Sequence, residues 1–265
     1  LSLVSSDIGS RLIGFLAVTY LARILGPENI GILAVGMATL TFSSIVSSMG
    51  IPLLGVRFVA ANISPIQNLV KKICTARFLL SIISFTLSIV ILMLCIEEKI
   101  TRNISIIFLI SMFPSSLKLE WLFQGLGKMR TLSIGQVLGM FAYLLFILGG
   151  VSNTEDIYLV PYAWCFGVLI QTIYLLFEYK KLDPNNNSNK QTLSLFEILK
   201  QALPIGTAEF LSQIIIQFPF FYIWYFDTIE NTGLYSVAFR VVILMLIIDR
   251  VFYTIFFPSV SQSFK

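Results

Sequence analysis

Long apolar runs with few charges recur along this chain of 265 residues. We place eight of them, at residues 3–25, 29–50, 74–95, 103–124, 131–150, 157–178, 204–226 and 233–256. Each is close to the roughly 20 residues that an α-helix needs to cross about 30 Å of hydrocarbon. The runs are continuous and lack the alternation of a membrane β-strand. The pattern therefore predicts an all-α integral membrane protein with about eight transmembrane helices.

Composition agrees with this fold class. Hydrophobic residues make up 57% of the chain and charged residues only 12%, with a mean hydropathy of +0.87. The chain contains no histidine, the commonest metal ligand and neutral-pH acid-base residue. The cysteines Cys74, Cys95 and Cys165 show no CxxC spacing and are interpreted as small hydrophobes. We expect no enzyme, no cofactor, no bound metal and no nucleic-acid partner.

Basic residues gather in every second connector between the runs. Eleven lie in the even-numbered connectors, namely Arg57, Lys71, Lys72, Arg77, Lys118, Lys128, Arg130, Lys180, Lys181, Lys190 and Lys200. The odd-numbered connectors hold only Arg23, Lys99 and Arg102. Since positive loops stay inside, the even connectors and the N-terminus are predicted to be cytoplasmic.

A short motif occurs twice. ENIGILAVG at residues 28–36 returns as ENTGLYSVA at residues 230–238, 202 residues later and identical at four of nine positions. Six predicted spans separate the copies, so both lie on the same side of the membrane. Before the second copy come a polar linker, DPNNNSN at residues 183–189, and the amphipathic LSLFEILKQALP. Parallel repeats of this kind are typical of transporters whose substrate site lies between the repeats.

The repeat predicts a domain division. Residues 1–182 form a first six-helix bundle, residues 183–203 a cytoplasmic linker and interfacial helix, and residues 204–265 the first two helices of a second, parallel bundle. Because the second bundle would then have only two spans, we expect the sequence to be a fragment of a protein with twelve or more.

Several segments carry a family resemblance. They are LARILGPENIGILAVGMATL at 21–40, GIPLLGVRFVA at 50–60, EWLFQGLGKMR at 120–130, LPIGTAEFLSQ at 203–213, TGLYSVAFRVV at 232–242 and FFPSVSQ at 256–262. In these segments the chain resembles bacterial polysaccharide repeat-unit flippases of the O-antigen type, within the multidrug/oligosaccharidyl-lipid/polysaccharide exporter superfamily. The resemblance implies alternating access of an undecaprenyl-diphosphate-linked oligosaccharide from the inner to the outer leaflet of the bacterial cytoplasmic membrane. Polysaccharide polymerases, glycosyltransferases and membrane lipids are the partners it implies.

The resemblance fails at one place. Members of that family often carry an acidic-basic pair in the middle of the seventh span. This chain has Gln217, Phe218, Pro219 and Phe220 there instead.

Ionisable residues inside the spans are the candidates for function, because each costs roughly 2.5 to 3.5 kcal/mol to insert. The 202-residue offset relates Asp7 to Glu209 and Arg11 to Gln213, which predicts a polar cavity between the halves. The alternative is a self-paired Asp7 and Arg11 with Glu209 at the interface. A diphosphate requires cations, and arginine suits it because its planar fork donates two hydrogen bonds. The substrate-binding candidates are Arg11, Arg57, Arg240, Gln213 and Gln217, and the ion-coupling candidates are Asp7, Glu209 and Asp249.

Two of these arginines have a second interpretation. Arg240 is either a cavity cation or an interface anchor, and Arg57 is also typical of an orientation signal. Gly135 and Gly139 indicate close helix packing, and Pro114 and Pro219 indicate interrupted helices.

Two other functions remain open from the sequence. One is an ion-coupled exporter of drugs or small molecules from the same superfamily, which would favour an acidic, aromatic cavity. The other is a non-transporting membrane scaffold of a glycan assembly complex, which needs no polar cavity.

Overall fold

The structure, a computed structural model, describes residues 2–182, 194–243 and 245, with side chains from Gly9 onward except that of Arg11. Its elements are α1 (Ser2–Ser48), α2 (Ile51–Ala60), α3 (Ile66–Cys95), α4 (Lys99–Ile110), α5 (Met112–Ser116), α6 (Glu120–Gly125), α7 (Met129–Gly150), the 3₁₀ helix η1 (Thr154–Tyr158), α8 (Leu159–Lys180) and α9 (Leu195–Phe226). Residues 229–243 are helical as well. The predicted all-α fold class is confirmed over this part of the chain.

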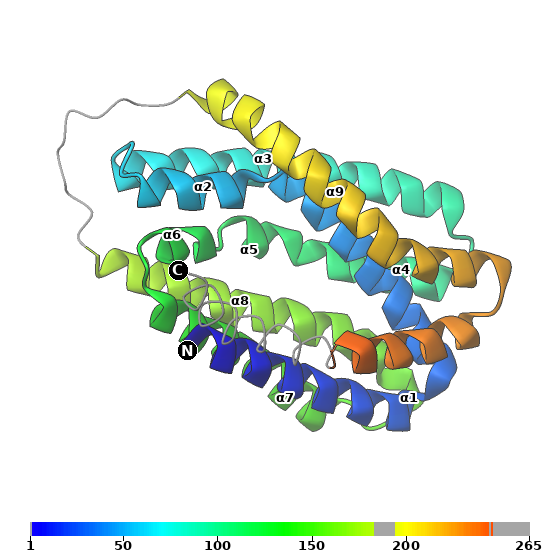
Figure 1. Ribbon diagram of the computed structural model, residues 1–265. Helices are drawn as coiled ribbons and strands as arrows, with labels where there is room; N and C mark the ends of the chain where they lie inside the picture. The colour runs from blue at the N-terminus through cyan, green and yellow to red at the C-terminus, as the bar shows by residue number, and fades with distance from the viewer. Residues whose placement is uncertain (1, 183–193, 244, 246–265) are drawn as a thin grey trace, which may run out of the picture.

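Helix α1 consists of two arms joined at Gly26. Gly26 has φ of 78° and ψ of 170°, a conformation that residues with a Cβ atom rarely adopt, and Pro27 follows it. Proline is tolerated there because the first turn of a helix needs no backbone N–H. We call residues 2–25 the first arm and residues 27–48 the second arm; they diverge from this point in Figure 1. The predicted runs 3–25 and 29–50 are therefore both present.

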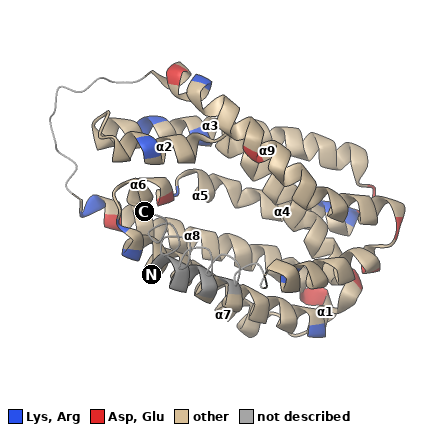
Figure 2. Cartoon of the chain, in the orientation of Figure 1, with Lys and Arg blue, Asp and Glu red and all other residues tan. Residues whose placement is uncertain are grey.

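The connections alternate between two ends of the bundle (Figure 1). We call one end the corner end; it includes the Gly26 kink, residues 96–98, residues 151–158 and the turn after α9. We call the other the linker end; it includes residues 61–65, residues 126–128, the end of α8 and the start of α9. Figure 2 shows Lys and Arg on α2, at the end of α8 and at the start of α9, all at the linker end. The order of the runs is as predicted; which side of the membrane each end faces stays a prediction.

Four helical stretches among the described residues are long and apolar enough to cross a membrane: Leu12–Ser48, Ile66–Cys95, Met129–Gly150 and Thr154–Lys180. The run predicted at 103–124 is instead divided into α4, α5 and α6. The run predicted at 204–226 is longer than expected, because α9 begins at Leu195 and continues through Pro204. The helix also continues through Pro219 to Phe226, so the interruption predicted at Pro219 is wrong.

Helix α9 starts at a capping box. Ser194 Oγ accepts a hydrogen bond from the Glu197 backbone N–H at 3.2 Å, and Glu197 Oε2 accepts one from the Ser194 N–H at 2.8 Å. These hydrogen bonds to the charged form lower the pKa of the Glu197 carboxyl. The cap therefore fixes the start of α9 upstream of the expected boundary at residue 204.

Two hydrophobic clusters hold the helices together. The cluster toward the corner end includes Leu25, Phe108 and Ile147, and the cluster toward the linker end includes Ile73 and Trp121. Small residues allow the closest helix approaches. A Cβ atom on Gly139 would lie 2.8 Å from the Gly167 carbonyl oxygen, and one on Gly167 would lie 2.7 Å from that of Gly139. The packing interpretation of Gly139 therefore agrees with the structure.

The two ENxG corners pack against each other at the corner end. A Cβ atom on Gly31 would overlap the carbonyl oxygen of Ile229, and a Cβ atom on Gly233 would overlap that of Pro27. Gly31 and Gly233 are 202 residues apart, and so are Pro27 and Ile229. The contact is therefore reciprocal and joins equivalent positions of the repeat, as a local two-fold relation requires.

The asparagines of the two corners also behave alike. Asn29 Nδ2 donates to the Leu25 carbonyl oxygen at 3.0 Å, and Asn231 Nδ2 donates to Asp227 Oδ2 at 2.9 Å. Both bonds run four residues back, and both partners are again related by 202 positions. The sequence repeat thus has a counterpart in local structure.

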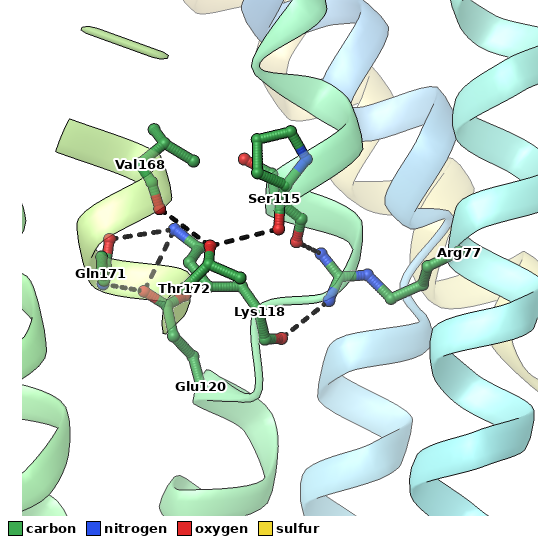
Figure 3. A network of polar contacts seen from close by, with 8 residues as sticks. Arg77, Ser115, Lys118, Glu120, Val168, Gln171 and Thr172 are labelled. Atoms are coloured by element: carbon green, nitrogen blue, oxygen red, sulfur yellow. Dashed lines mark hydrogen bonds and ion pairs between the residues drawn. The ribbon is translucent and has the colours of Figure 1, made fainter. Parts of the chain in front are cut away.

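A polar network stabilises the interrupted fourth span (Figure 3). Arg77 of α3 donates from Nη1 to the Lys118 carbonyl oxygen at 3.1 Å and from Nη2 to the Ser115 carbonyl oxygen at 2.8 Å. These carbonyls lie where α5 ends, and a helix end leaves its last carbonyls without partners. The Ser115 carbonyl oxygen also accepts from the Lys118 backbone N–H at 3.2 Å, so the guanidinium adds a second hydrogen bond there and provides a donor for the Lys118 carbonyl oxygen.

The same network reaches α8. Lys118 Nζ lies 3.2 Å from Glu120 Oε1 and 3.3 Å from Gln171 Oε1, and Gln171 Nε2 donates to Glu120 Oε1 at 2.6 Å. Thr172 Oγ1 lies 3.2 Å from the Pro114 carbonyl oxygen. The broken span is thus tied to α3 on one side and to α8 on the other.

Replacing Gly31 or Gly233 by alanine is expected to destabilise the protein, because the new methyl group meets a backbone carbonyl that cannot rotate away. Overpacking of this kind costs about 1–3 kcal/mol. Thermal unfolding of the purified protein in detergent measures the effect. Gly149→Ala is the matched control, since a Cβ atom there meets nothing within 4 Å. Equal melting temperatures for Gly31→Ala and Gly149→Ala would contradict the reciprocal corner contact.

Arg77→Lys is expected to lower stability by about 1–3 kcal/mol, since one ammonium cannot reproduce the two-pronged contact with Ser115 and Lys118. The same thermal unfolding assay applies. Lys71→Arg, an exchange at an exposed position of the same helix, serves as the control and should be neutral. An Arg77→Lys protein as stable as the control would show that the guanidinium does not hold the helix break.

Candidate functional site

A cavity of about 290 Å³ lies between helices of both expected bundles. The two arms of α1 and Met140 of α7 form one side, and α9 and residues 229–243 form the other. Most of the wall is apolar, with Phe15, Met37, Phe220 and Phe239 among the lining residues. The polar lining residues are Thr41, Gln217, Ser236 and Arg240. The cavity is therefore a largely apolar space that a few polar groups enter.

Two of these polar side chains are already satisfied. Thr41 Oγ1 donates to the Met37 carbonyl oxygen at 2.8 Å, and Ser236 Oγ donates to the Gly233 carbonyl oxygen at 2.8 Å. In the part of the chain that the structure describes, the side chains of Gln217 and Arg240 form no hydrogen bond or ion pair within the protein. The cavity thus offers a ligand one amide and one guanidinium, and a guanidinium binds phosphate or carboxylate in a two-pronged manner.

Arg240 also borders a small extension of the cavity, of about 50 Å³, on the side of the first bundle. Tyr143 of α7 and Trp164 of α8 line it, with ring centroids 5.6 Å apart and ring planes at 85°. The structure therefore places Arg240 against an aromatic wall of the first bundle, although the residue itself belongs to the eighth run.

A polar stripe runs along α9. Glu209, Gln213 and Gln217 are spaced four residues apart, which puts them on one face over about 12 Å of helix. Glu209 and Gln213 line a wider pocket of about 720 Å³ between α9 and the α1–α2 junction, where Ile45 and Leu53 form the opposite wall. The stripe thus connects the level of this pocket with the level of the Arg240 cavity.

The remaining predicted site residues are not brought to these spaces by the structure. Arg57 is exposed on α2 at the linker end and lines neither pocket. Asp7 and Arg11 lie on the first arm of α1, but their side chains are outside the described part, as is all of Asp249. Gln217 and Arg240 are therefore brought together, and so are Glu209 and Gln213.

Sequence reasoning missed the network of Arg77, Lys118, Glu120 and Gln171. It assigned Arg77 and Lys118 to connectors as orientation signals, with Lys118 also a reserve cation for the diphosphate, and it did not single out Glu120. The sequence feature that could have indicated the network is Pro114. It interrupts an apolar run shortly before the opposite charges of Lys118 and Glu120. These residues line neither pocket, and their contacts explain a structural role.

Among residues 2–182 and 194–243, no group of three or more cysteine or carboxylate side chains is arranged to hold a metal ion.

Comparisons with solved structures show the fold alone, because the sequence identities are low. The outward-facing conformation of a multidrug resistance MATE family transporter of the MOP superfamily matches with a TM-score of 0.63 at 15% identity. The MATE multidrug transporter DinF-BH, solved as a complex, matches with a TM-score of 0.61 at 14% identity. Each match covers 93% of this chain and 60% of the other.

A MOP superfamily transporter from Pyrococcus furiosus matches with a TM-score of 0.55 at 16% identity, over 93% of this chain and 59% of that one. The chain thus spans about 60% of the length of the structures it resembles. No curated protein sequence matches it significantly.

The family model described as polysaccharide biosynthesis protein matches residues 1–264, nearly the whole chain. The chain belongs to this polysaccharide biosynthesis protein family.

Proposed function

We propose that the protein is a transporter that moves a prenyl-diphosphate-linked oligosaccharide from the inner to the outer leaflet of the bacterial cytoplasmic membrane, for surface polysaccharide biosynthesis of the O-antigen type. Family membership and the MATE-like fold support a transporter with two bundles. In this proposal residues 1–182 form the first bundle, residues 204–265 begin the second, and the N-terminus and the 183–203 linker face the cytoplasm.

The observation that carries the proposal is the Arg240 cavity. A guanidinium that no described residue pairs with lies in an apolar space between helices of the two bundles, next to the amide of Gln217. A cation without an anionic partner in such a space costs free energy, and this cost is offset when an anionic group binds. A diphosphate supplies such a group, and Gln217 adds a hydrogen bond beside it.

The polar stripe of α9 extends the site. Gln213 and Glu209 continue from Gln217 toward the wider pocket, so the glutamine can donate and accept hydrogen bonds, and the glutamate accept them, at sugar hydroxyls. Glu209 is also the described member of the three carboxylates proposed for ion coupling, with Asp7 and Asp249 as the others. The corner contact at Gly31 and Gly233 joins helices of the two proposed bundles at backbone distance and gives them a point about which to move.

A second candidate is an exporter of small cationic molecules, favoured by the fold shared with multidrug MATE transporters and by the phenylalanines in the cavity wall. Arg240 separates the two candidates, because a guanidinium attracts an anionic head group and repels a cation.

Arg240→Ala is expected to lower translocation of a fluorescent prenyl-diphosphate oligosaccharide by about 10- to 100-fold, the equivalent of losing a charge-assisted hydrogen-bonded contact. The assay follows leaflet accessibility in vesicles that contain the complete protein. Arg240→Lys should restore part of the rate, since it keeps the charge and loses the fork. Arg130→Ala, at an exposed position of α7, is the control. Translocation unaffected by Arg240→Ala would refute the proposed head-group site, and export of a cationic dye instead of the glycan would favour the second candidate.

Glu209→Gln is expected to remove the acceleration that an imposed proton or sodium gradient gives, while downhill exchange of the substrate persists, because an amide keeps the shape and cannot carry the coupling charge. The measurement compares translocation with and without the gradient. Glu155→Gln, at an exposed carboxylate of the corner end, is the matched control. A Glu209→Gln protein that still responds fully to the gradient rules out this residue as the coupling group.

A further inference from the structure

The first turns of α9 carry two apolar faces. Ile198 and Ala202 are fully buried in the hydrophobic cluster of the linker end, which also contains residues of α2 and α3. Phe196 and Leu203 are instead 75% and 45% exposed. Phe196, Lys200 and Leu203 follow one another at intervals of four and three residues, which places them on one side of the helix. The start of α9 therefore docks on the bundle with one face and presents a second apolar face, which contains one lysine, to its surroundings.

The same side of α9 continues as an apolar surface toward the middle of the bundle. Leu211 lies eleven residues beyond Lys200, which puts it on the same side about 16 Å further along the helix. Leu211 and the neighbouring Ile215 are 63% and 79% exposed. Because α3, which contacts α9, is a stretch that can cross a membrane, these side chains meet hydrocarbon. Lys200 and Phe196 therefore lie toward the head groups, where lysines snorkel and interfacial helices bury phenylalanine.

The two helices beside the start of α9 add further cations at the linker end, as Figure 2 shows for α2. Residues 51–72, which form α2 and the first turns of α3, include three basic residues and no acidic residue. Residues 194–203 include one of each, and the acidic one, Glu197, is held by the capping box. The basic residues on these adjoining elements form a patch that we call the linker-end basic patch: Arg57, Lys71, Lys72 and Lys200. Four cations thus accompany one carboxylate.

The corner end of the bundle carries the opposite charge. Its described basic residues are Arg23, Lys99 and Arg102, and the exposed carboxylates outnumber them: Glu28, Glu97, Glu98, Glu155, Asp227 and Glu230. An anionic membrane surface attracts a basic segment over a distance of about one Debye length and repels an acidic one. Of the two ends, the linker end is therefore the one that suits an anionic bilayer surface.

We propose that the start of α9 and the linker-end basic patch bind anionic phospholipid at the membrane surface. The cations attract the lipid phosphate, and Phe196 and Leu203 contact the first methylene groups of the acyl chains. A phospholipid fits better than a soluble polyanion, because the exposed apolar side chains lie on the same helix side as Lys200. The bilayer then stabilises the docked position of the start of α9 on α2 and α3. This inference does not depend on which substrate the protein moves.

The test follows thermal unfolding of the complete protein, delipidated in neutral detergent, as phosphatidylglycerol or phosphatidylcholine is added. A ligand that binds the folded state raises the melting temperature, so phosphatidylglycerol is expected to raise it at concentrations at which phosphatidylcholine does not. In the double variant Lys71→Gln/Lys200→Gln, the same rise should need about 10- to 30-fold more phosphatidylglycerol. The matched control, Lys99→Gln/Arg102→Gln, removes two cations from α4 at the corner end and should respond like the wild-type protein.

A second variant tests the apolar part of the proposed site. Phe196→Ser keeps every charge and removes the contact with the acyl chains, so about 5- to 10-fold more phosphatidylglycerol should be needed. Glycerol phosphate, which has the head group and lacks the chains, should not compete. Native mass spectrometry of the same samples counts the retained phosphatidylglycerol and gives a readout that does not rely on unfolding.

Three results would overturn the proposal. One is an equal response of the wild-type protein to phosphatidylcholine and phosphatidylglycerol, and another is an equal loss of response in the linker-end and corner-end double variants. The third is competition by glycerol phosphate together with an unchanged Phe196→Ser protein, which would make the patch a site for soluble phosphate compounds. Since none of these measurements involves translocation, their outcome is independent of the proposed transport function.

Discussion

The cost of an unsatisfied polar group in an apolar bundle governs this structure. Where the fourth span is broken and where hydroxyls are buried against α3, partners come from within the protein: Arg77 donates to the carbonyls at the end of α5, and Ser43 pairs with Ser88. Arg240 differs from these groups, because no described residue pairs with its guanidinium. Against a background in which most buried polar groups are satisfied, such a cation between two sets of helices is the strongest pointer to a ligand.

The repeat explains how such a space forms between bundles and not within one. The overlap of hypothetical side chains at Gly31 and Gly233 shows that the two corners approach to backbone contact at equivalent positions. A contact made only by glycine and backbone depends little on side-chain identity and holds the corner end together. The Arg240 cavity lies between the arms of α1 on one side and α9 with residues 229–243 on the other. At the far end of the second arm, α1 and α9 meet again, since a Cβ atom on Gly206 would lie 2.7 Å from the Met49 carbonyl oxygen.

The sequence predicts the fold class and the order of the runs well, since hydropathy and the alternation of basic connectors both reflect the membrane directly. It predicts separate runs at 3–25 and 29–50, between which Gly26 and Pro27 impose their local backbone preferences. It also predicts the repeat, from the identities between residues 28–36 and 230–238. Pro114 indicates an interruption of the run at 103–124 but not its form, which Arg77 and Gln171 stabilise from positions distant in sequence. Gln217 and Arg240 line the same cavity because of the way α9 packs against residues 229–243. The hydrophobic periodicity of a sequence does not determine the packing angle between two helices.

The division of labour between the faces of α1 and α9 follows from residue size and charge at neighbouring positions. Consecutive helical residues point about 100° apart, so Thr41 and Phe42, or Phe220 and Phe221, necessarily face different surroundings. One helix pair can therefore present a polar space to one side and an aromatic groove to the other without any change in backbone.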